Sequence, residues 1–243
     1  MPDLIFEDVR LVSIYDALDG PRQDLDHYIS IVKEFGAQSV LDVGCGTGSL
    51  ACLLAESGLK IAGVDPARAS LDFARTKPNA DHVQWILGDA TTLPPLTVDL
   101  ALMTGNVAQV FVTDQSWQET LNCIRKALNR NGHLVFEVRD PAKKAWLEWT
   151  RDKTYQRINI PNVGFVKVWC EVKDVSMETV SFRWTYIFET DGKTISSDST
   201  LRFRERDEVE NSLEKSGFIV KEIRDAPDRP GKEFVFIAIP AAK

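Results

Sequence analysis

Three glycines spaced by single residues follow a short apolar run, and this stretch constrains the fold more than any other. It reads "SVLDVGCGTGSLACLLAESG", residues 39–58, and places Gly44, Gly46 and Gly48 between a strand pattern and a helix pattern. Glycine is favoured where the backbone must turn sharply or lie against a ligand. The stretch therefore predicts a strand, a ligand-binding loop and a helix in that order.

Strand and helix patterns alternate around this unit. Apolar runs that predict strands lie at residues 39–44, 59–65, 82–89, 98–106, 133–140, 218–225 and 233–240. Amphipathic stretches that predict helices lie at residues 47–58, 66–76, 114–132 and 207–217. Continuous apolar strands separated by helices are typical of a parallel sheet covered on both faces.

The pattern changes near residue 160. Residues 162–173, 181–190 and 193–204 each place apolar side chains at every second position, which predicts antiparallel strands with one buried face. Asp191-Gly192 predicts a two-residue turn between the second and third of these strands. The apolar face of this meander must cover something, either the main domain as a lid or a second copy as a dimer surface.

We therefore expect an α/β fold: a Rossmann-like, mostly parallel sheet with helices on both faces and an inserted antiparallel β-meander. The expected parts are an N-terminal helical cap, a cofactor-binding core, the meander, and a last helix with two strands that complete the core sheet. Their boundaries are residues 1–35, 36–150, 160–205 and 206–243.

Composition excludes several classes of function. The chain has 243 residues and a net charge of −7, which disfavours tracking a nucleic-acid backbone. No apolar run approaches the roughly 18 residues of a membrane span. Four cysteines without a C-x-x-C pair, and three scattered histidines, predict neither a disulfide framework nor a metal site. We expect a cytoplasmic protein that binds neither nucleic acid nor membranes, as a monomer or homodimer.

Acidic residues stand where the predicted strands end. Asp65 lies 21 residues after Gly44 (65 − 44), where an acid binds ribose hydroxyls in nucleoside-binding folds. Asp89 and Ala90 at the third strand end suit the amine of an adenine. A dinucleotide loop reads G-x-G-x-x-G, but position 49 is serine, and no P-loop lysine follows. Asp42 would repel a phosphate, so we expect an adenosine with a small, unphosphorylated group over the glycines.

Three segments together resemble the first signature segments of the class I S-adenosylmethionine-dependent methyltransferases. They are "VLDVGCGTGSL", "GVDPARASLDFAR" and "WILGDATTLP", and the likeness covers residues 35–140 and resumes in the last two strands. The resemblance implies a seven-stranded sheet whose final strand is antiparallel. It also implies that "SIYDAL" forms a helix over the cofactor, with Tyr15 beside it, and that Asn106 lines the face of methyl transfer.

The cofactor expected from the resemblance is S-adenosyl-L-methionine, and the reaction is a direct in-line displacement onto a small-molecule acceptor. The expected cofactor-binding residues are Tyr15, Asp42, Gly44, Cys45, Gly46, Gly48, Asp65, Pro66, Asp89, Ala90 and Asn106. On the acceptor side, Arg139 could anchor an acidic group, while Trp146 and Trp149 could wall the pocket.

The chemistry leaves some choices open. A general base is needed only if the acceptor must lose a proton, and Tyr15 and His27 are the candidates. Two other functions stay open: a nicotinamide-dependent oxidoreductase, which Ser49 disfavours, and a cofactor-binding module of the same fold without catalysis.

Overall fold

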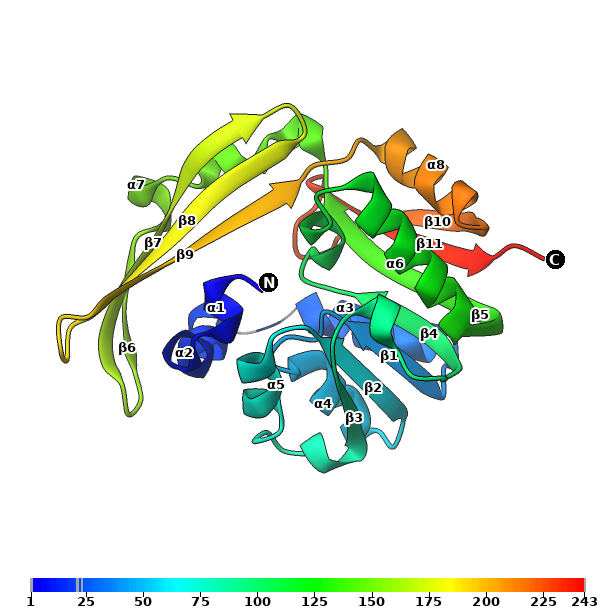
Figure 1. The fold of residues 1–243 in the computed structure, drawn as a ribbon, viewed down its shortest axis with the longest axis horizontal. Coiled ribbons are helices and arrows are strands. Elements are labelled where there is room, and N and C mark those ends of the chain that lie inside the picture. Colours follow the sequence, from blue (N-terminus) through cyan, green and yellow to red (C-terminus); the bar gives the residue numbers. More distant parts are fainter. Residues whose placement is uncertain (1, 21, 23, 243) are drawn as a thin grey trace.

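Seven strands form one twisted sheet at the centre of the molecule (Figure 1). The structure is a computed structural model that describes residues 2–20, 22 and 24–242. The strand order is β10-β11-β5-β4-β1-β2-β3. The strands are β1 (Ser39–Val43), β2 (Lys60–Asp65), β3 (Val83–Leu87), β4 (Val98–Met103), β5 (Leu128–Arg139), β10 (Phe218–Asp225) and β11 (Glu233–Pro240).

The order of the strands reverses beside β1, which pairs in parallel with both β2 and β4. Strand β11 pairs antiparallel with β5 and with β10, so the expected antiparallel final strand is confirmed. In open α/β sheets a ligand binds beyond the carboxyl ends of the strands at such a reversal. The topology thus places the predicted loops of β1, β2, β3 and β4 along one edge of the sheet.

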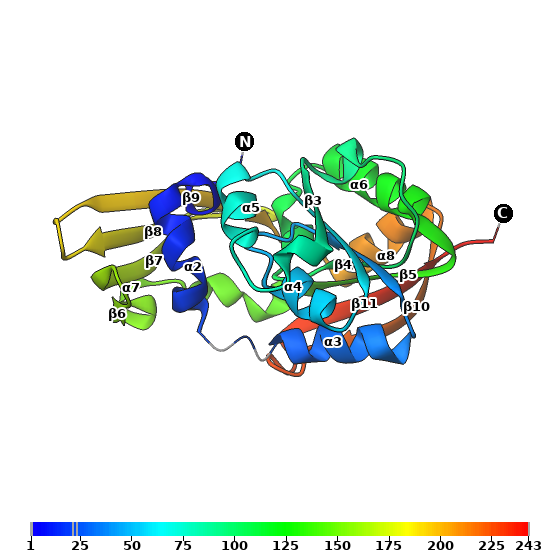
Figure 2. The same ribbon diagram turned by 90° about the horizontal axis from the view of Figure 1, so that it is seen from below.

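Helices cover both faces of the sheet (Figure 2). Helices α3 (Asp24–Glu34) and α4 (Ser49–Glu56) bury Leu25, Ile31, Leu50 and Leu54 against one face. On the other face, α6 (Asp114–Ala127) and α8 (Arg206–Lys215) bury a second apolar set: Trp117, Leu121, Ile124, Val209 and Leu213. The short elements are α5 (Arg68–Ala74), α7 (Arg151–Thr154), η1 (Ala80–His82), η2 (Ala90–Thr92), η3 (Val107–Val110), η4 (Pro141–Lys143) and η5 (Ala145–Glu148).

Two predicted helix boundaries are wrong. The helix expected at residues 114–132 ends at Ala127, because Leu128 is already extended and starts β5. Leu128 packs in the same apolar cluster as the helix, so its burial fitted the helical period although its backbone is that of a strand. Helix α5 begins at Arg68, and Pro66 lies exposed in the turn before it.

The meander is part of a separate four-stranded sheet with the order β6-β7-β8-β9. Its strands are β6 (Gln156–Ile160), β7 (Gly164–Ser176), β8 (Thr179–Phe188) and β9 (Thr194–Arg202). The pairs Val168–Tyr186 and Cys170–Trp184 confirm the predicted shared face. Strand β6 was not predicted; it pairs with β7 and forms one edge of this sheet. The turn prediction is also wrong, since the last β8–β9 pair is Ile187–Thr194 and the loop is longer than two residues.

The inner face of the meander packs against the N-terminal helices of the same chain (Figure 1). Helix α1 (Leu4–Glu7) precedes α2 (Val9–Asp19), and α2 inserts Leu11 and Ile14 between Val166, Tyr186 and Phe188. This apolar cluster is distinct from the two clusters of the main sheet. Among the described residues no helix is both long and apolar enough to cross a membrane.

Replacing Ile14 should loosen the meander before the main sheet. Ile14 is fully buried in the α2–meander cluster, so Ile14→Ala should lower the free energy of unfolding by about 2–5 kcal/mol. Hydrogen exchange should speed up mainly in β7 and β8, because these strands lose their cover. The control is Val9→Ala on the same helix, where the side chain is 77% exposed. Equal loss of protection in β1 and β4 would contradict a separate cluster.

Candidate cofactor and acceptor site

The glycine loop turns directly from β1 into α4. Gly44, Gly46 and Gly48 all have positive φ, at 72°, 52° and 74°. A Cβ on Gly44 would lie 2.6 Å from Val107 and could not be accommodated, whereas a Cβ on Gly46 would meet nothing within 4 Å. The loop therefore needs glycine at Gly44 for its fold, and at Gly46 it leaves open space into which a ligand can approach the backbone.

Asp65 links the loop to the end of β2. One carboxylate oxygen accepts the Gly46 amide at 2.8 Å and the other accepts the Ala67 amide at 2.8 Å. Burial raises the pKa of Asp65, and these two amides oppose the rise. A carboxylate oxygen can accept further hydrogen bonds, so Asp65 both organises the loop and retains acceptor capacity for a ligand.

Asp42, at the end of β1, is buried and has an unsatisfied oxygen. Its side chain is 2% exposed, and Oδ1 has no hydrogen-bond partner among the described residues. Burial, with the nearby charge of Asp65, raises the pKa of Asp42 to about 7. A buried, unpaired carboxylate is costly, so this position favours a cationic or hydrogen-bond-donating ligand.

Helix α2 contacts the loop from the other side. Asp16 accepts the Thr47 hydroxyl at 2.6 Å and pairs with Lys77. Tyr15 lies beside Asp16, and its ring contacts Phe6 with centroids 5.6 Å apart. Burial and then Asp19 raise the pKa of the Tyr15 phenol, which keeps it protonated at neutral pH. The structure thus brings the helix that contains Tyr15 to the glycine loop.

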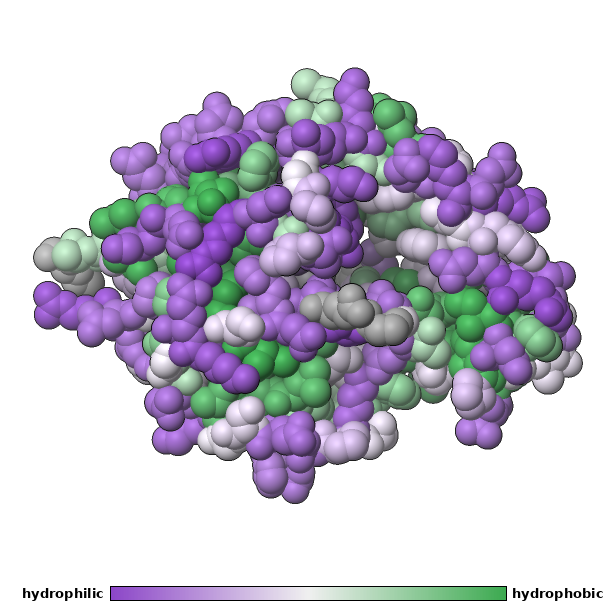
Figure 3. Space-filling model, turned by 180° about the vertical axis from the view of Figure 1, so that it is seen from behind, coloured by the Kyte–Doolittle hydropathy of each residue, from purple (hydrophilic) through white to green (hydrophobic). Residues whose placement is uncertain are grey.

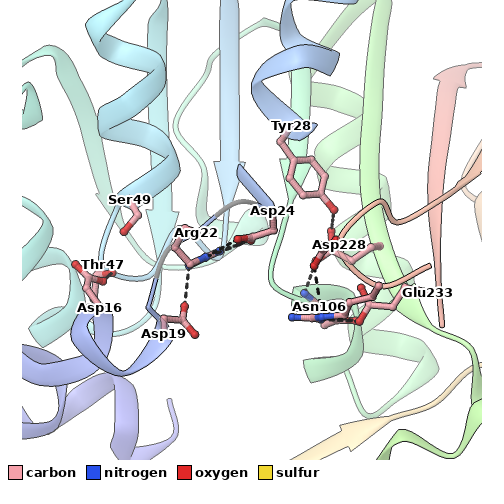
Figure 4. Close-up of polar contacts among 12 residues, drawn as sticks. Asp16, Asp19, Arg22, Asp24, Tyr28, Thr47, Ser49, Asn106, Asp228 and Glu233 are labelled. Carbon is pink, nitrogen blue, oxygen red and sulfur yellow. Dashed lines mark hydrogen bonds and ion pairs between the residues drawn. The ribbon is translucent and has the colours of Figure 1, made fainter. Parts of the chain in front are cut away.

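Arg22 follows α2 and was not predicted as a site residue. Its guanidinium donates to Asp19 and Asp24 at 2.7–2.9 Å, as Figure 4 shows. The positive charge of Arg22 partly opposes the rise in the pKa of Asp42 and of Tyr15. Its signal in the sequence was a single basic residue between acids in "LDGPRQD".

Asp89 and Ala90 lie at the end of β3, next to β2. Asp89 is exposed and caps η2, where its carboxylate accepts the Thr91 amide at 2.8 Å. Ala90 is buried. Capping of η2 explains the acid at this position. Only one oxygen of Asp89 takes part in the cap.

Asn106 follows β4 and belongs to a buried polar network (Figure 4). Its backbone amide donates to Glu137 at 2.6 Å, and its side-chain amide donates to Glu233 at 3.2 Å. The Tyr28 hydroxyl donates to the other oxygen of Glu137. Burial raises the pKa of Glu137 to about 7, against the hydrogen bonds from Tyr28 and Asn106. Glu137 was also missed, although it is a lone acid inside the apolar run "HLVFEV".

Arg139 and the two tryptophans lie beyond this network. Arg139 donates to Gln109 at 3.0 Å, and its guanidinium carbon lies 5.6 Å from the ring centre of Trp149. Trp149 contacts Phe182 of the meander and Trp146 contacts Phe203, with centroids 4.7 Å apart in each pair. His27 does not join this group, because its charged neighbours are Arg224, Asp228 and Glu34.

The surface is hollowed between the main sheet and the meander, as Figure 3 shows from behind. A separate shallow cavity of about 540 Å³ lies around the edge strand β9 and is lined by Lys173, Arg183 and Asp198. None of the predicted cofactor residues lines it. Within residues 2–20, 22 and 24–242, no cluster of His, Cys, Asp or Glu is suited to a metal ion. Cys45 is buried, and burial raises the pKa of its thiol.

Comparison with known proteins shows which proteins this chain resembles. Residues 40–132 match the family model of a methyltransferase domain. The cypemycin N-terminal methyltransferase of Streptomyces sp is 29% identical over 150 residues, which is 59% of this chain and 60% of that protein. The chain thus spans less than two thirds of this curated relative, and it matches 45% of the length of the next one.

Two solved structures share the whole fold. The CcbJ methyltransferase from Streptomyces caelestis has a TM-score of 0.79 at 20% identity, over 97% of each chain. The sugar N-methyltransferase KedS8 from Streptoalloteichus sp has a TM-score of 0.74 at 18% identity, over 91% of this chain and 88% of that one.

A Rossmann-like sheet with a glycine loop and an acid at the next strand end defines a nucleoside-binding α/β domain. Residues 40–132 match a methyltransferase domain and the fold is shared with solved methyltransferases, so the predicted resemblance to the class I S-adenosylmethionine-dependent methyltransferases is confirmed. The residues at the carboxyl edge would suit the cofactor of that family, since Gly46 faces open space and Asp42 keeps an unpaired oxygen among the described residues.

Asp42 should make stability depend on pH. Its pKa is about 7 in the folded chain against about 4 when unfolded, so the folded state binds the proton more tightly between these values. The free energy of unfolding should therefore fall as pH rises from about 4 to 7. Asp42→Asn should reduce this slope, to which Glu137 also contributes, and stabilise the protein above pH 7 by more than about 1.4 kcal/mol, the equivalent of one pKa unit. Urea unfolding across pH measures this effect, with the exposed Asp81→Asn as the control. A slope unchanged by Asp42→Asn would contradict a protonated, buried Asp42.

Proposed function

We propose that this protein transfers a methyl group from S-adenosyl-L-methionine to a small-molecule acceptor. The observation that carries the proposal is the meeting of Gly46, Asp65, Asp42 and Arg22 at one end of the sheet. The cofactor contains a carboxylate, an ammonium, a sulfonium and a ribose, and each of these four residues suits the binding of one part of it. The match of residues 40–132 to a methyltransferase domain supports the same cofactor.

The charges suggest how the cofactor lies. Arg22 would receive the carboxylate, while the unpaired oxygen of Asp42 would receive the ammonium. The backbone of Gly44, Cys45, Gly46 and Gly48 would lie under the methionine part. Asp65 would bind the ribose, Asp89 and Ala90 would flank the adenine, and Pro66 and Tyr15 would border the pocket.

The acceptor would enter between the core and the meander. Arg139, Trp146 and Trp149 lie on that side, and Trp149 contacts the meander through Phe182. The inner face of the meander packs on α1 and α2 of the same chain, which supports a lid rather than a dimer surface. On this proposal residues 1–35 and 160–205 together cover a core formed by residues 36–150 and 206–243.

When bound, the cofactor supplies a methyl group on an already activated sulfonium. The chain therefore has to hold the acceptor in line with that methyl group and exclude water, which can contribute about 7–11 kcal/mol to lowering the barrier. Tyr15 is a poor base at neutral pH because its raised pKa keeps the phenol protonated. His27 lies with Arg224 and Glu34, away from the loop residues.

Two other functions remain testable. An oxidoreductase using a nicotinamide would need its third glycine at position 49, where Ser49 begins α4. A cofactor-binding module without catalysis would bind the cofactor but form no S-adenosylhomocysteine. Some similar proteins are named as N-methyltransferases, so amines are the first acceptors to assay. The free cysteines support a reducing, cytoplasmic location.

Asp65→Ala should weaken binding of S-adenosylhomocysteine by about 1–3 kcal/mol, the cost of losing hydrogen bonds to a charged group. It should also lower stability, because the Gly46 and Ala67 amides lose their acceptor. Calorimetric titration measures the affinity, and Asp72→Ala on the exposed side of α5 is the matched control. An affinity unchanged by Asp65→Ala would show that the ribose lies elsewhere.

Arg22→Ala should discriminate between two ligands. S-adenosylhomocysteine keeps the amino-acid carboxylate, and its dissociation constant should rise at least tenfold, or about 1.4 kcal/mol. 5′-Methylthioadenosine lacks that group, and its affinity should stay within about twofold of the wild type. Arg68→Ala, on the exposed start of α5, provides the control. Equal losses for both ligands would mean that Arg22 shapes the pocket without binding the carboxylate.

A further inference from the structure

Asn106 is fixed from two sides by carboxylates. Its backbone amide donates to Glu137 at 2.6 Å, and Nδ2 donates to Glu233 at 3.2 Å. Tyr28 from α3 donates to the second oxygen of Glu137 and so fixes that carboxylate in turn. The backbone of Asn106 is left-handed, with φ of 62°, a conformation that asparagine accepts more readily than most residues. Both the position and the rotation of this side chain are therefore determined.

The carboxamide can face only one way. Glu233 is an acceptor, so Nδ2 must be the atom turned toward it; the flipped amide would place oxygen against oxygen. Glu233 begins β11, which lies beyond β5 from β4. Because the two branches of a carboxamide diverge, Oδ1 is turned away from β11. Oδ1 is buried and has no hydrogen-bond partner within the described part of the chain. A buried acceptor without a protein donor has room for one hydrogen bond, which a ligand N–H or a water molecule can donate.

The carboxylates near Asn106 are engaged by other groups of the chain. Both oxygens of Glu137 accept hydrogen bonds, from Tyr28 and from Asn106. Glu233 is paired with Arg229 at 2.6 Å and Arg139 at 3.6 Å. Asp42 keeps a free oxygen, but it lies beside the glycine loop and is assigned above to the cofactor. A carboxamide oxygen can accept a hydrogen bond but cannot remove a proton from a hydroxyl group.

A hydrogen-bond acceptor that cannot act as a base favours an amine over a hydroxyl group as the nucleophile. A hydroxyl group needs a base to become a good nucleophile, whereas a neutral amine attacks with its lone pair and keeps its hydrogens until afterwards. An amine can donate one N–H to Oδ1 and still direct its lone pair elsewhere. The aromatic side chains of Trp149 and Phe182 lie on the same side of the molecule as Arg139 and suit the body of such a molecule.

We propose that Asn106 Oδ1 binds an N–H of the acceptor, and that the acceptor is a primary or secondary amine. This inference rests on the proposed methyl transfer and names its substrate class. In the step, the amine lone pair forms the N–C bond and the C–S bond breaks, with its electron pair remaining on a neutral thioether. The product ammonium then releases its extra proton to water. Tyr28, Glu137 and Glu233 act as positioning residues, because they hold Asn106.

The test compares amines with their matched alcohols on the full chain. The pairs are benzylamine with benzyl alcohol and glucosamine with glucose, each assayed for formation of S-adenosylhomocysteine and for binding to the protein loaded with that product. We expect kcat/KM at least 100-fold higher for an amine than for its alcohol.

Asn106→Gly, which keeps the left-handed backbone accessible, should lower kcat/KM for the amine at least tenfold and raise its KM. The dissociation constant of S-adenosylhomocysteine should stay within about twofold.

Two control variants distinguish loss of acceptor binding from a purely structural effect of changing Asn106. Asn129→Ala changes an asparagine at the opposite edge of the sheet, hydrogen-bonded to Asp99, and should leave activity unchanged. Asn106→Asp combined with Glu233→Gln exchanges the polarity of their hydrogen bond, with net charge kept, and still presents an oxygen to the acceptor. This double variant should recover activity that Asn106→Asp alone loses, with melting temperatures recorded for all variants.

The outcomes separate the two proposals. Failure to bind S-adenosylhomocysteine would overturn the proposed function and this inference together. Binding with a preference for alcohols or thiols, or amines bound no more tightly than their alcohols, would overturn the amine assignment alone. An Asn106→Gly variant as active as the wild type would remove Asn106 from acceptor recognition. A loss of S-adenosylhomocysteine affinity with unchanged amine KM would assign Oδ1 to the cofactor and would equally overturn the inference.

Discussion

Burial of carboxylates at the carboxyl edge of the sheet is the constraint on which the rest of the structure depends. Asp42, Asp65, Glu137 and Glu233 are each less than 10% exposed. A carboxylate in the interior is unfavourable unless it is paired or hydrogen-bonded. Backbone amides satisfy Asp65, and guanidinium groups satisfy Glu233. Asp42 has no such compensation, so a cationic ligand would remove a cost that the free protein bears.

These compensations also explain how the loops are ordered. The Gly46 amide donates to Asp65, and the Asn106 amide donates to Glu137. In each case an acid at the end of one strand fixes the loop that follows a neighbouring strand. The same groups that make the edge acidic therefore give it a defined shape. A site built in this way is preorganised, because the ligand does not have to order the backbone when it binds.

The sequence was sufficient for the parts of the fold that depend on local pattern. The mostly parallel sheet and the shared face of Val168 and Tyr186 follow from apolar runs and period-two alternation. The sequence was insufficient where contacts between distant residues determine the local structure. Leu128 has the same burial in a helix or a strand, so its pattern could not mark the end of α6. The partners of Asn106 come from β5 and β11, a residue of α3 holds one of them, and no spacing in the sequence joins these elements. Arg22 likewise needs its fold to bring it near Asp42.

Helix α2 contacts both the meander and the glycine loop. On one side Ile14 and Leu11 are buried against the meander, and on the other Asp16 binds Thr47 of the glycine loop. The meander and the glycine loop, which we propose to cover the acceptor and to lie under the cofactor, are therefore joined through one short helix. A shift of the meander large enough to admit an acceptor must either carry α2 with it, and so strain the Asp16–Thr47 hydrogen bond, or expose the apolar surface around Ile14. Because exposing that surface costs more than breaking one hydrogen bond, α2 should follow the meander, and access for the acceptor and order in the cofactor loop become linked.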